Sequence, residues 1–253
     1  MERITSRTNP LCVHIRKLNT SNAYRRERGE FVGEGPKLLA EALKAGAGVT
    51  AVVAEEGRQV SCPDSVRRVE VPAGVLESLC DTRTPQGVLF LCRAPELTLP
   101  EKLEGSRYLV LDGVQDPGNV GTVWRTADAF GADGLILLGG CADPLSPKVV
   151  RSTMGAVFRL PVWQTDAGTL RERCAAAGLP LYATALREDT GDIGQSDLRR
   201  CAVVIGSEGR GVSEKVLSLC EKTLKIPMRE RCESLNAAVA AAVVLWEGWR
   251  AGM

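Results

Sequence analysis

One histidine, His14, stands in this sequence, and none of the nine cysteines forms a C-x-x-C pair. A zinc site needs clustered cysteine or histidine ligands, so we expect no metal. Scattered cysteines in odd number are also unlike the disulfide framework of a short secreted chain. We therefore expect free thiols in a reducing cytoplasm, with Cys201 in the core because it begins an apolar strand. A lone histidine disfavours a Ser-His or Cys-His nucleophile.

Long apolar runs and a strong net charge are missing as well. The longest apolar run, Ala237 to Trp246, is shorter than the roughly 18 to 20 residues that cross a bilayer. The beginning of the sequence lacks the apolar core of a signal peptide, so we expect no membrane partner. The formal net charge is only +1, which gives no overall field that attracts a polyanion.

The composition is that of an ordinary globular protein. The 253 residues are 44% hydrophobic and 25% charged, enough for one large or two modest domains. Residues 93–107 contain Pro95 and Pro100, three glutamates and little apolar periodicity, which indicates a linker. We therefore predict a first domain over residues 1–93, a linker over 94–107 and a second domain over 108–253.

Strands alternate with helices in both predicted domains. In the first, we expect strands at 30–33, 49–54, 66–71 and 87–91, and helices at 36–45 and 73–79. In the second, we expect strands at 107–111, 134–138, 180–184, 202–205 and 223–226, an extended piece at 158–162, and helices at 120–130, 168–177, 213–220 and 235–250. Apolar strands between helices indicate an α/β fold with a parallel sheet covered on both faces.

The first thirty residues are locally basic, with seven arginines and lysines against three glutamates. Such a segment can neutralise phosphates, although a solvated, charged helix face explains the same charges equally well. Under the first interpretation His14 lies at the surface or faces a nucleic acid. The candidate contacts are Arg7, Arg16, Lys17, Arg25 and Arg26.

Three loops follow predicted strands, where ligands bind in open α/β sheets. The first runs from Asp112 to Asn119, which is placed to cap the next helix, and Arg125 follows within that helix. Helix amides and a guanidinium suit an anion such as an RNA phosphate. A turn with a structural arginine is the alternative for this loop alone.

The second loop, Gly206 to Gly211, contains three glycines that let the backbone approach a ligand, and Glu208 lies inside it. Its spacing is not G-x-G-x-x-G, which disfavours a nicotinamide site. The third loop runs from Ile226 to Asn236. We expect Ser234 to cap the last helix and Asn236, in its first turn, to need a partner for its amide.

Together these segments resemble the SpoU-type (TrmH-like) RNA 2′-O-ribose methyltransferases of the SPOUT superfamily. The resemblance rests on N-V-G-T-V-W-R-T-A-D-A-F-G from Asn119, I-G-S-E-G-R-G from Ile205 and I-P-M-R-E-R-C-E-S-L-N-A-A-V-A from Ile226, in the expected order. The first domain resembles the family's substrate-binding domain in F-V-G-E-G-P-K-L-L from Phe31 and T-P-Q-G-V-L from Thr84. The five motifs occur in order, and the resemblance extends over nearly the whole chain.

The resemblance implies a fold, a cofactor and a set of site residues. The fold is a trefoil-knotted α/β methyltransferase domain after a smaller α/β RNA-binding domain, and the assembly is a homodimer with its active site near the subunit interface. The cofactor is S-adenosyl-L-methionine. The resemblance assigns cofactor binding to Thr184, Ala185, Leu186, Gly206, Ile226 and Leu235, and catalysis to Arg125, Asn119, Glu208, Ser234 and Asn236.

The resemblance leaves the RNA substrate open. The separate first domain favours ribosomal RNA over transfer RNA, because minimal transfer-RNA enzymes of the family lack that domain. A non-catalytic RNA-binding protein that retains the fold, or an α/β enzyme using another nucleotide, are the alternative functions. The apolar face of the last helix, with Leu235, Ala238, Val239, Ala242, Trp246 and Trp249, is compatible with a dimer interface and with plain core packing.

Overall fold

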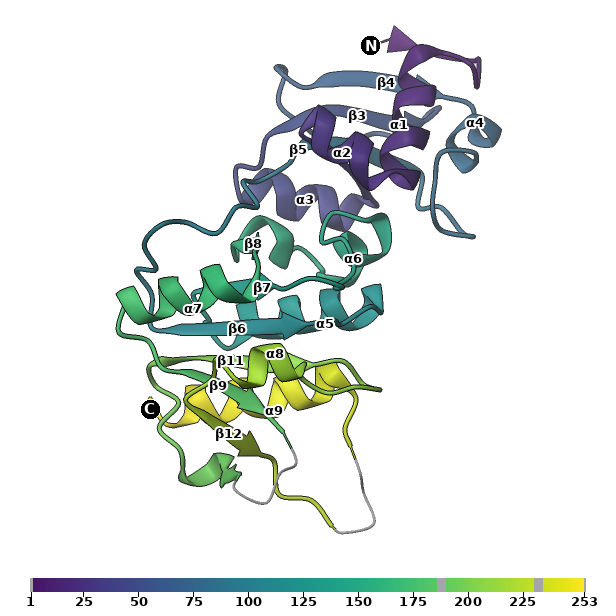
Figure 1. The fold of residues 1–253 in the computed structure, drawn as a ribbon. Coiled ribbons are helices and arrows are strands. Elements are labelled where there is room, and N and C mark those ends of the chain that lie inside the picture. The colour runs from purple at the N-terminus through teal and green to yellow at the C-terminus, as the bar shows by residue number, and fades with distance from the viewer. Residues whose placement is uncertain (1, 186–189, 230–233, 253) are drawn as a thin grey trace. The chain divides into compact units, whose positions relative to one another are not determined.

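A computed structural model of the chain describes residues 2–185, 190–229 and 234–252 (Figure 1). It contains two compact units. The first consists of Met1–Pro95 together with Asp143–Arg159, and the second of Glu96–Ala142 together with Leu160–Met253.

The first unit is built on a mixed five-stranded sheet in the order β1-β4-β3-β5-β2, in which β5 runs antiparallel to both of its neighbours. Helices α1, α2 and α4 accompany the sheet, and their apolar side chains share a core with it. The elements are β1 (Glu2–Arg3), α1 (Pro10–Thr20), α2 (Asn22–Arg28), β2 (Glu30–Glu34), α3 (Pro36–Lys44), β3 (Val49–Glu55), β4 (Arg67–Val71), α4 (Ala73–Glu77), β5 (Val88–Arg93), α6 (Pro147–Ser152) and the 3-10 turn η1 (Ala156–Phe158).

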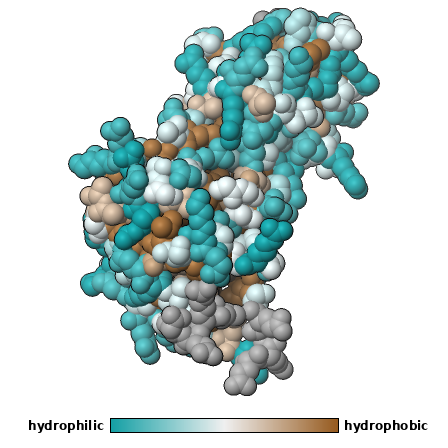
Figure 2. Space-filling view, viewed as in Figure 1, coloured by the Kyte–Doolittle hydropathy of each residue, from teal (hydrophilic) through white to brown (hydrophobic). Residues whose placement is uncertain are grey.

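Two of these helices, α1 and α2, lie in the basic segment, for which no helix bounds were predicted. Asn9 caps α1 by accepting a hydrogen bond from the Leu11 amide at 2.9 Å, and Pro10 occupies the first turn. Ser21 caps α2, which ends at Gly29 in the left-handed conformation (φ 60°). In the view of Figure 2, hydrophilic side chains cover most of the first unit.

Residues 143–159 were assigned to the second domain on sequence, but the structure groups them with the first unit. The Phe158 ring lies 6.2 Å from Phe31 and 6.3 Å from Phe90, between ring centroids. Arg151 pairs with Asp81 at 3.1 Å. The segment is therefore bound to the first unit by aromatic packing and by ion pairs.

The second unit contains a seven-stranded, fully parallel sheet in the order β10-β12-β9-β11-β6-β7-β8. Helices α5 and α9 pack against each other, and α9 contacts β6 and β11, while α7 and α8 share a core with the other side of the sheet. The elements are β6 (Arg107–Asp112), α5 (Pro117–Ala129), β7 (Gly134–Leu137), β8 (Val162–Gln164), α7 (Ala167–Ala176), β9 (Leu181–Thr184), β10 (Gly191–Asp192), η2 (Ile193–Gln195), β11 (Cys201–Gly206), α8 (Glu214–Leu217), β12 (Lys222–Lys225) and α9 (Ala237–Arg250). Central strands buried on both faces explain their continuous apolar runs.

The predicted linker 94–107 differs from the observed structure. Leu99 and Leu103 are buried in the core of the second unit, and the Gln164 amide donates to the Leu97 carbonyl at 2.6 Å. Because these two leucines are buried there, the segment packs on the core of the second unit and is not a free linker. The extended piece expected at 158–162 is also wrong for most of its length, since β8 begins only at Val162.

The cysteines that the structure describes are all free thiols, and Cys232 lies outside the described residues. Cys201 is buried in the core as expected, and burial raises its pKa to about 12. Within residues 2–185, 190–229 and 234–252, no helix has the length and apolar character needed to cross a membrane. The same residues contain no cluster of three or more metal-ligating side chains.

Candidate functional site

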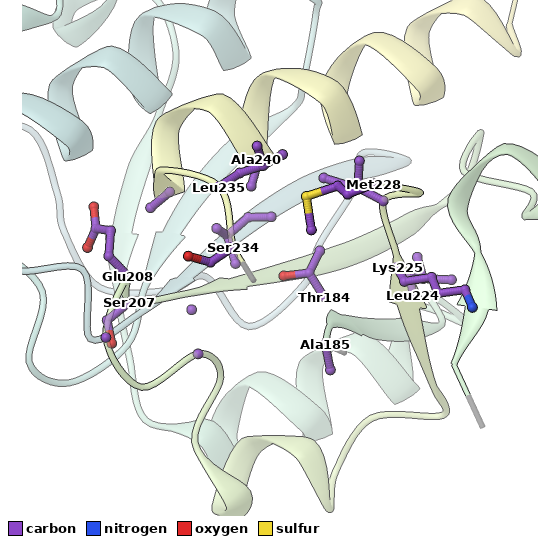
Figure 3. A pocket seen from close by; sticks show the side chains of 16 residues that line it. Thr184, Ala185, Ser207, Glu208, Leu224, Lys225, Met228, Ser234, Leu235 and Ala240 are labelled. Atoms are coloured by element: carbon purple, nitrogen blue, oxygen red, sulfur yellow. The ribbon is translucent and has the colours of Figure 1, made fainter. Parts of the chain in front are cut away.

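A pocket of about 300 Å³ opens where β9, β11 and β12 end, at the carboxyl edge of the second unit's sheet (Figure 3). It is lined by five of the six predicted cofactor residues, Thr184, Ala185, Gly206, Ile226 and Leu235. The sixth, Leu186, lies outside the described residues. Three segments far apart in the sequence therefore meet at one pocket, as expected for ligand binding at this edge.

The glycine loop after β11 closes on itself. The amides of Ser207 and Gly211 each donate to the other's carbonyl, at 3.1 and 2.9 Å. A Cβ on Gly206 would lie 2.0 Å from the carbonyl carbon of Gly211, and Gly211 has a φ of 66°. The close approach predicted for a ligand at Gly206 is thus made by the loop's own backbone. The Asp112 carboxylate at the end of β6 accepts from the Ser213 amide at 2.7 Å and anchors the loop's exit.

We expect Gly206→Ala to abolish ligand binding in this pocket, because its methyl group has to displace the backbone of Gly211. Gly139→Ala is the matched control, since a Cβ there meets nothing within 4 Å and Gly139 does not line the pocket. Isothermal titration with S-adenosyl-L-homocysteine measures both variants. Unchanged affinity in Gly206→Ala would show that the loop opens freely in solution.

Three of the predicted catalytic residues form a hydrogen-bonded chain beside the pocket. The Asn119 side-chain amide donates to the Glu208 carboxylate, and the Asn236 amide donates to the Asn119 side-chain oxygen at 3.2 Å. The Asn236 oxygen in turn accepts from the backbone amides of Ala238 and Val239 at 2.9 and 3.3 Å. The amide of Asn119 is therefore oriented from both ends, and α5, α9 and the glycine loop are joined.

The capping predictions for these helices are wrong in two places. The N-cap of α5 is Asp116, whose side chain accepts from the Asn119 amide at 2.8 Å, so Asn119 lies in the first turn with its own side chain available for the site. The N-cap of α9 is Asn236 rather than Ser234. Ser234 instead lines the pocket with an exposed side chain (Figure 3).

Arg125 lies two turns into α5 and is exposed to solvent. Its guanidinium makes no hydrogen bond or ion pair with any residue that the structure describes, and it does not line the pocket. A charged side chain on the same helix as Asn119, with no partner among the described residues, is available to an external anion. The pocket is also lined by Lys225, Met228 and Ala240, which were not predicted. Met228 and Ala240 lie in the motif that begins at Ile226, and Lys225 directly precedes it.

The candidate RNA contacts of the basic segment separate into two groups. Arg7, Lys17 and Arg26 are exposed, and Arg16 is half-buried. Arg25 is only 4% exposed and donates from Nε to the Asp143 carboxylate at 2.9 Å, so its assignment as an RNA contact is wrong.

His14 is not a surface side chain open to RNA either. It is half-buried and bonded through its ring nitrogens to the Tyr24 hydroxyl at 2.9 Å and the Glu30 carboxylate at 3.0 Å. The single histidine therefore joins α1, α2 and β2 within the first unit.

Comparison with known proteins gives matches over both units. Residues 106–246 match the SpoU rRNA Methylase family, and residues 9–89 match the MRM3-like substrate binding domain. An uncharacterized tRNA/rRNA methyltransferase of Synechocystis is 36% identical over 98% of this chain and 93% of its own length. The 23S rRNA (guanosine(2553)-2′-O)-methyltransferase RlmP of Bacillus subtilis is 33% identical over 97% of this chain and 98% of its own.

Among solved structures, the AdoMet-bound rRNA methyltransferase of Sinorhizobium meliloti superposes with a TM-score of 0.86 and 31% identity, covering 98% of this chain and 97% of that one. The predicted fold class, an α/β-knot methyltransferase domain with a smaller α/β domain before it, is confirmed by this likeness over both units. Because the family match spans more than half of the sequence and full-length relatives exceed 30% identity, the chain belongs to the SpoU rRNA methylase family.

Proposed function

We propose that this protein transfers a methyl group from S-adenosyl-L-methionine to a ribose 2′-hydroxyl of ribosomal RNA. One observation carries the proposal. Glu208 lines the pocket and is also the end of the hydrogen-bonded chain Glu208–Asn119–Asn236, so the pocket and the chain are adjacent. A cofactor site and an oriented polar group are what a methyl transfer to a hydroxyl requires.

The pocket suits S-adenosyl-L-methionine in size and chemistry. Its volume of about 300 Å³ lies at the lower end of the range for small-molecule sites. Apolar side chains of Leu224, Met228 and Leu235 line it together with the Thr184 and Ser234 hydroxyls. Backbone groups at Gly206, Ile226 and Leu235 would hold the adenosine portion. When bound, this cofactor supplies a methyl group on a sulfonium, which leaves without help from an acid.

The chain's own residues have to position the ribose oxygen and ease the loss of its proton. Arginine keeps its charge in proteins, so we assign Arg125 the role of holding the target phosphate and stabilising the developing alkoxide. Asn119, fixed by Asn236, holds the Glu208 carboxylate beside the pocket. This arrangement favours an active enzyme over a non-catalytic RNA-binding protein.

Ribosomal RNA is the substrate that the comparisons favour. The Bacillus subtilis relative is named a 23S rRNA methyltransferase, and the Sinorhizobium meliloti structure an rRNA methyltransferase. Both cover nearly the whole of this chain, including the first unit. Because these relatives match both units of the chain, they support ribosomal RNA as its class of substrate.

We also propose a homodimer, formed through α5 and α9. Of the apolar face expected on the last helix, Ala238 is buried within the unit, but Val239 is 49% and Trp246 is 43% exposed. The Trp246 ring lies 5.3 Å from Trp249 and 5.8 Å from Phe130, the C-cap residue of α5, between centroids. An exposed aromatic cluster of this kind is stabilised by a protein partner. Light scattering should give twice the 27.1 kDa of one chain, and a monomer mass would contradict the dimer.

The test of the function is transfer of tritium from labelled S-adenosyl-L-methionine to total RNA of cells that lack the gene, followed by nucleoside analysis. We expect label in one 2′-O-methylated nucleoside of ribosomal RNA. Precursor ribosomal particles are included as a second substrate, because some sites are accessible only during assembly. Absence of transfer to either substrate, together with absence of cofactor binding, would support the non-catalytic alternative.

A further inference from the structure

A groove of about 480 Å³ lies beside the start of α3 in the first unit. We call it the α3 groove and define it by Glu34, Lys37, Thr84, Gln86, Arg151 and Met154, which line it. It lies entirely within the first unit, because Arg151 and Met154 belong to the 143–159 segment that packs there. Its size is that of a small-molecule or nucleotide site.

The acidic groups at the groove are already occupied. Glu34 accepts hydrogen bonds from the Thr82 hydroxyl and, at 3.2 Å, from the Asp81 amide. Glu41, at the groove's edge, pairs with Arg159. Asp81 accepts two bonds from the Arg151 guanidinium, both at 3.1 Å. These carboxylates therefore leave little capacity for an outside cation.

The groups that stay open in the groove can donate hydrogen bonds. Lys37 and the side chains of Thr84 and Gln86 are exposed and make no hydrogen bond or ion pair within the described part of the chain. Lysine donates only, whereas the hydroxyl and the amide both donate and accept. The groove thus offers one cation and two adaptable polar groups, which suits a phosphate and a nucleobase edge.

Met154 gives the groove an exposed apolar surface in an unusual backbone state. Its φ is 49°, the one positive value among the described residues other than glycine, and its side chain is 52% exposed. Left-handed backbone is uncommon for a residue of this size and clusters at functional sites. A methionine sulfur packs favourably against aromatic rings, and nucleobases are aromatic.

We propose that the α3 groove holds one unpaired nucleotide of the RNA substrate, with its base against Met154, its edge at Gln86 and Thr84, and its phosphate at Lys37. The proposal rests on the proposed function, since it names a second contact for the same RNA. Single-stranded bases are the usual target of specific RNA readout. The match of residues 9–89 to a substrate binding domain covers Lys37, Thr84 and Gln86.

The four methionines make the groove directly observable. Met154 lies in the α3 groove and Met228 in the cofactor pocket, while Met1 and Met253 are at the ends of the sequence. In the full chain labelled with ¹³C-methyl methionine, we expect a twelve-nucleotide single-stranded RNA of mixed sequence to shift the Met154 signal. S-adenosyl-L-homocysteine should shift Met228 and leave Met154 in place. The same RNA annealed to its complement should leave Met154 unmoved.

Matched variants locate the contact. Lys37→Ala should weaken binding of the single strand about fivefold or more and lower the salt dependence by about one counterion, whereas Lys44→Ala, exposed on the same helix outside the groove, should bind like the parent. Met154→Gly suits the backbone at φ 49° and should keep or raise the melting temperature while weakening binding. A purely structural Met154 would give no change in affinity.

The outcomes separate this proposal from the proposed function. If the chain methylates ribosomal RNA but neither RNA moves Met154 and Lys37→Ala binds normally, the groove proposal is overturned and the function stands. If Met154 shifts with single-stranded RNA and no methyl transfer occurs, the groove proposal stands and the enzymatic function fails. Equal shifts of Met154 with duplex and single strand would also overturn the unpaired-nucleotide assignment.

Discussion

Arg125→Ala should lose turnover while it retains cofactor binding. The guanidinium is exposed, unpaired among the residues that the structure describes, and outside the pocket lining, so its removal leaves the pocket intact. If it stabilises the developing alkoxide, its loss costs about 3 kcal/mol in the transition state, which is on the order of a hundredfold in rate. Single-turnover methyl transfer and titration with S-adenosyl-L-homocysteine measure the two properties separately.

Two further variants define what Arg125 contributes. Arg125→Lys keeps the charge but loses the planar fork, and we expect only partial recovery of the rate. Arg171→Ala is the control, because it removes an equal charge outside the pocket. Arg171 lies on α7 and forms an ion pair with Glu221 at 3.4 Å. Equal losses of turnover and cofactor affinity in Arg125→Ala would contradict the assigned role.

The alternation of strands and helices was readable from the sequence because it depends on local periodicity. The strand expected at 107–111 is observed at Arg107–Asp112, and the helix expected at 36–45 at Pro36–Lys44. The helix α1 was missed although its signal was present: Leu11, Ile15 and Leu18 are buried at helical spacing. The many charged residues of that segment made its amphipathic pattern hard to recognise.

Helix ends were less predictable where two capping residues compete. Asp116 and Asn119 both suit an N-cap, and Pro117 decides between them, since proline is favoured directly after the cap. Asn236 takes the cap of α9, and Ser234, two residues earlier, is left in the pocket. In both helices the predicted cap was a polar residue near the helix start, but a different polar residue, two or three positions away, forms the cap.

Long-range pairing left no local trace in the sequence. The Asn119 and Asn236 side chains are 117 residues apart in the chain, and no periodicity places one beside the other. Their convergence was implied only by the family resemblance. Neither the periodicity nor the family resemblance predicted that residues 143–159 pack within the first unit. The aromatic packing of Phe158 on Phe31 depends on the folded arrangement of both segments.

Arg25→Ala removes one member of the buried ion pair between Arg25 and Asp143 and should destabilise the first unit strongly. Arg25 and Asp143 have side chains only 5% and 14% exposed, and the guanidinium also donates to the Leu18 carbonyl. Removing one member of a buried ion pair leaves the other charge uncompensated, at a cost of about 3–5 kcal/mol. Arg26→Ala, at an exposed neighbouring position, should change stability by only about 0.5 kcal/mol.

The distribution of tryptophans allows the two units to be followed separately in urea. All four, Trp124, Trp163, Trp246 and Trp249, belong to the second unit, so their fluorescence reports that unit while far-ultraviolet circular dichroism reports both. We expect Arg25→Ala to move an early dichroism transition to lower urea by about 1–5 M, given an m value of about 1–3 kcal/mol/M. The fluorescence midpoint should move less.

Arg25→Met with Asp143→Leu should recover much of the stability, because no charge is then left buried. If Arg25→Ala instead kept its stability and lost only RNA affinity, Arg25 would be an RNA contact after all, and the ion pair would not hold residues 143–159 to the first unit.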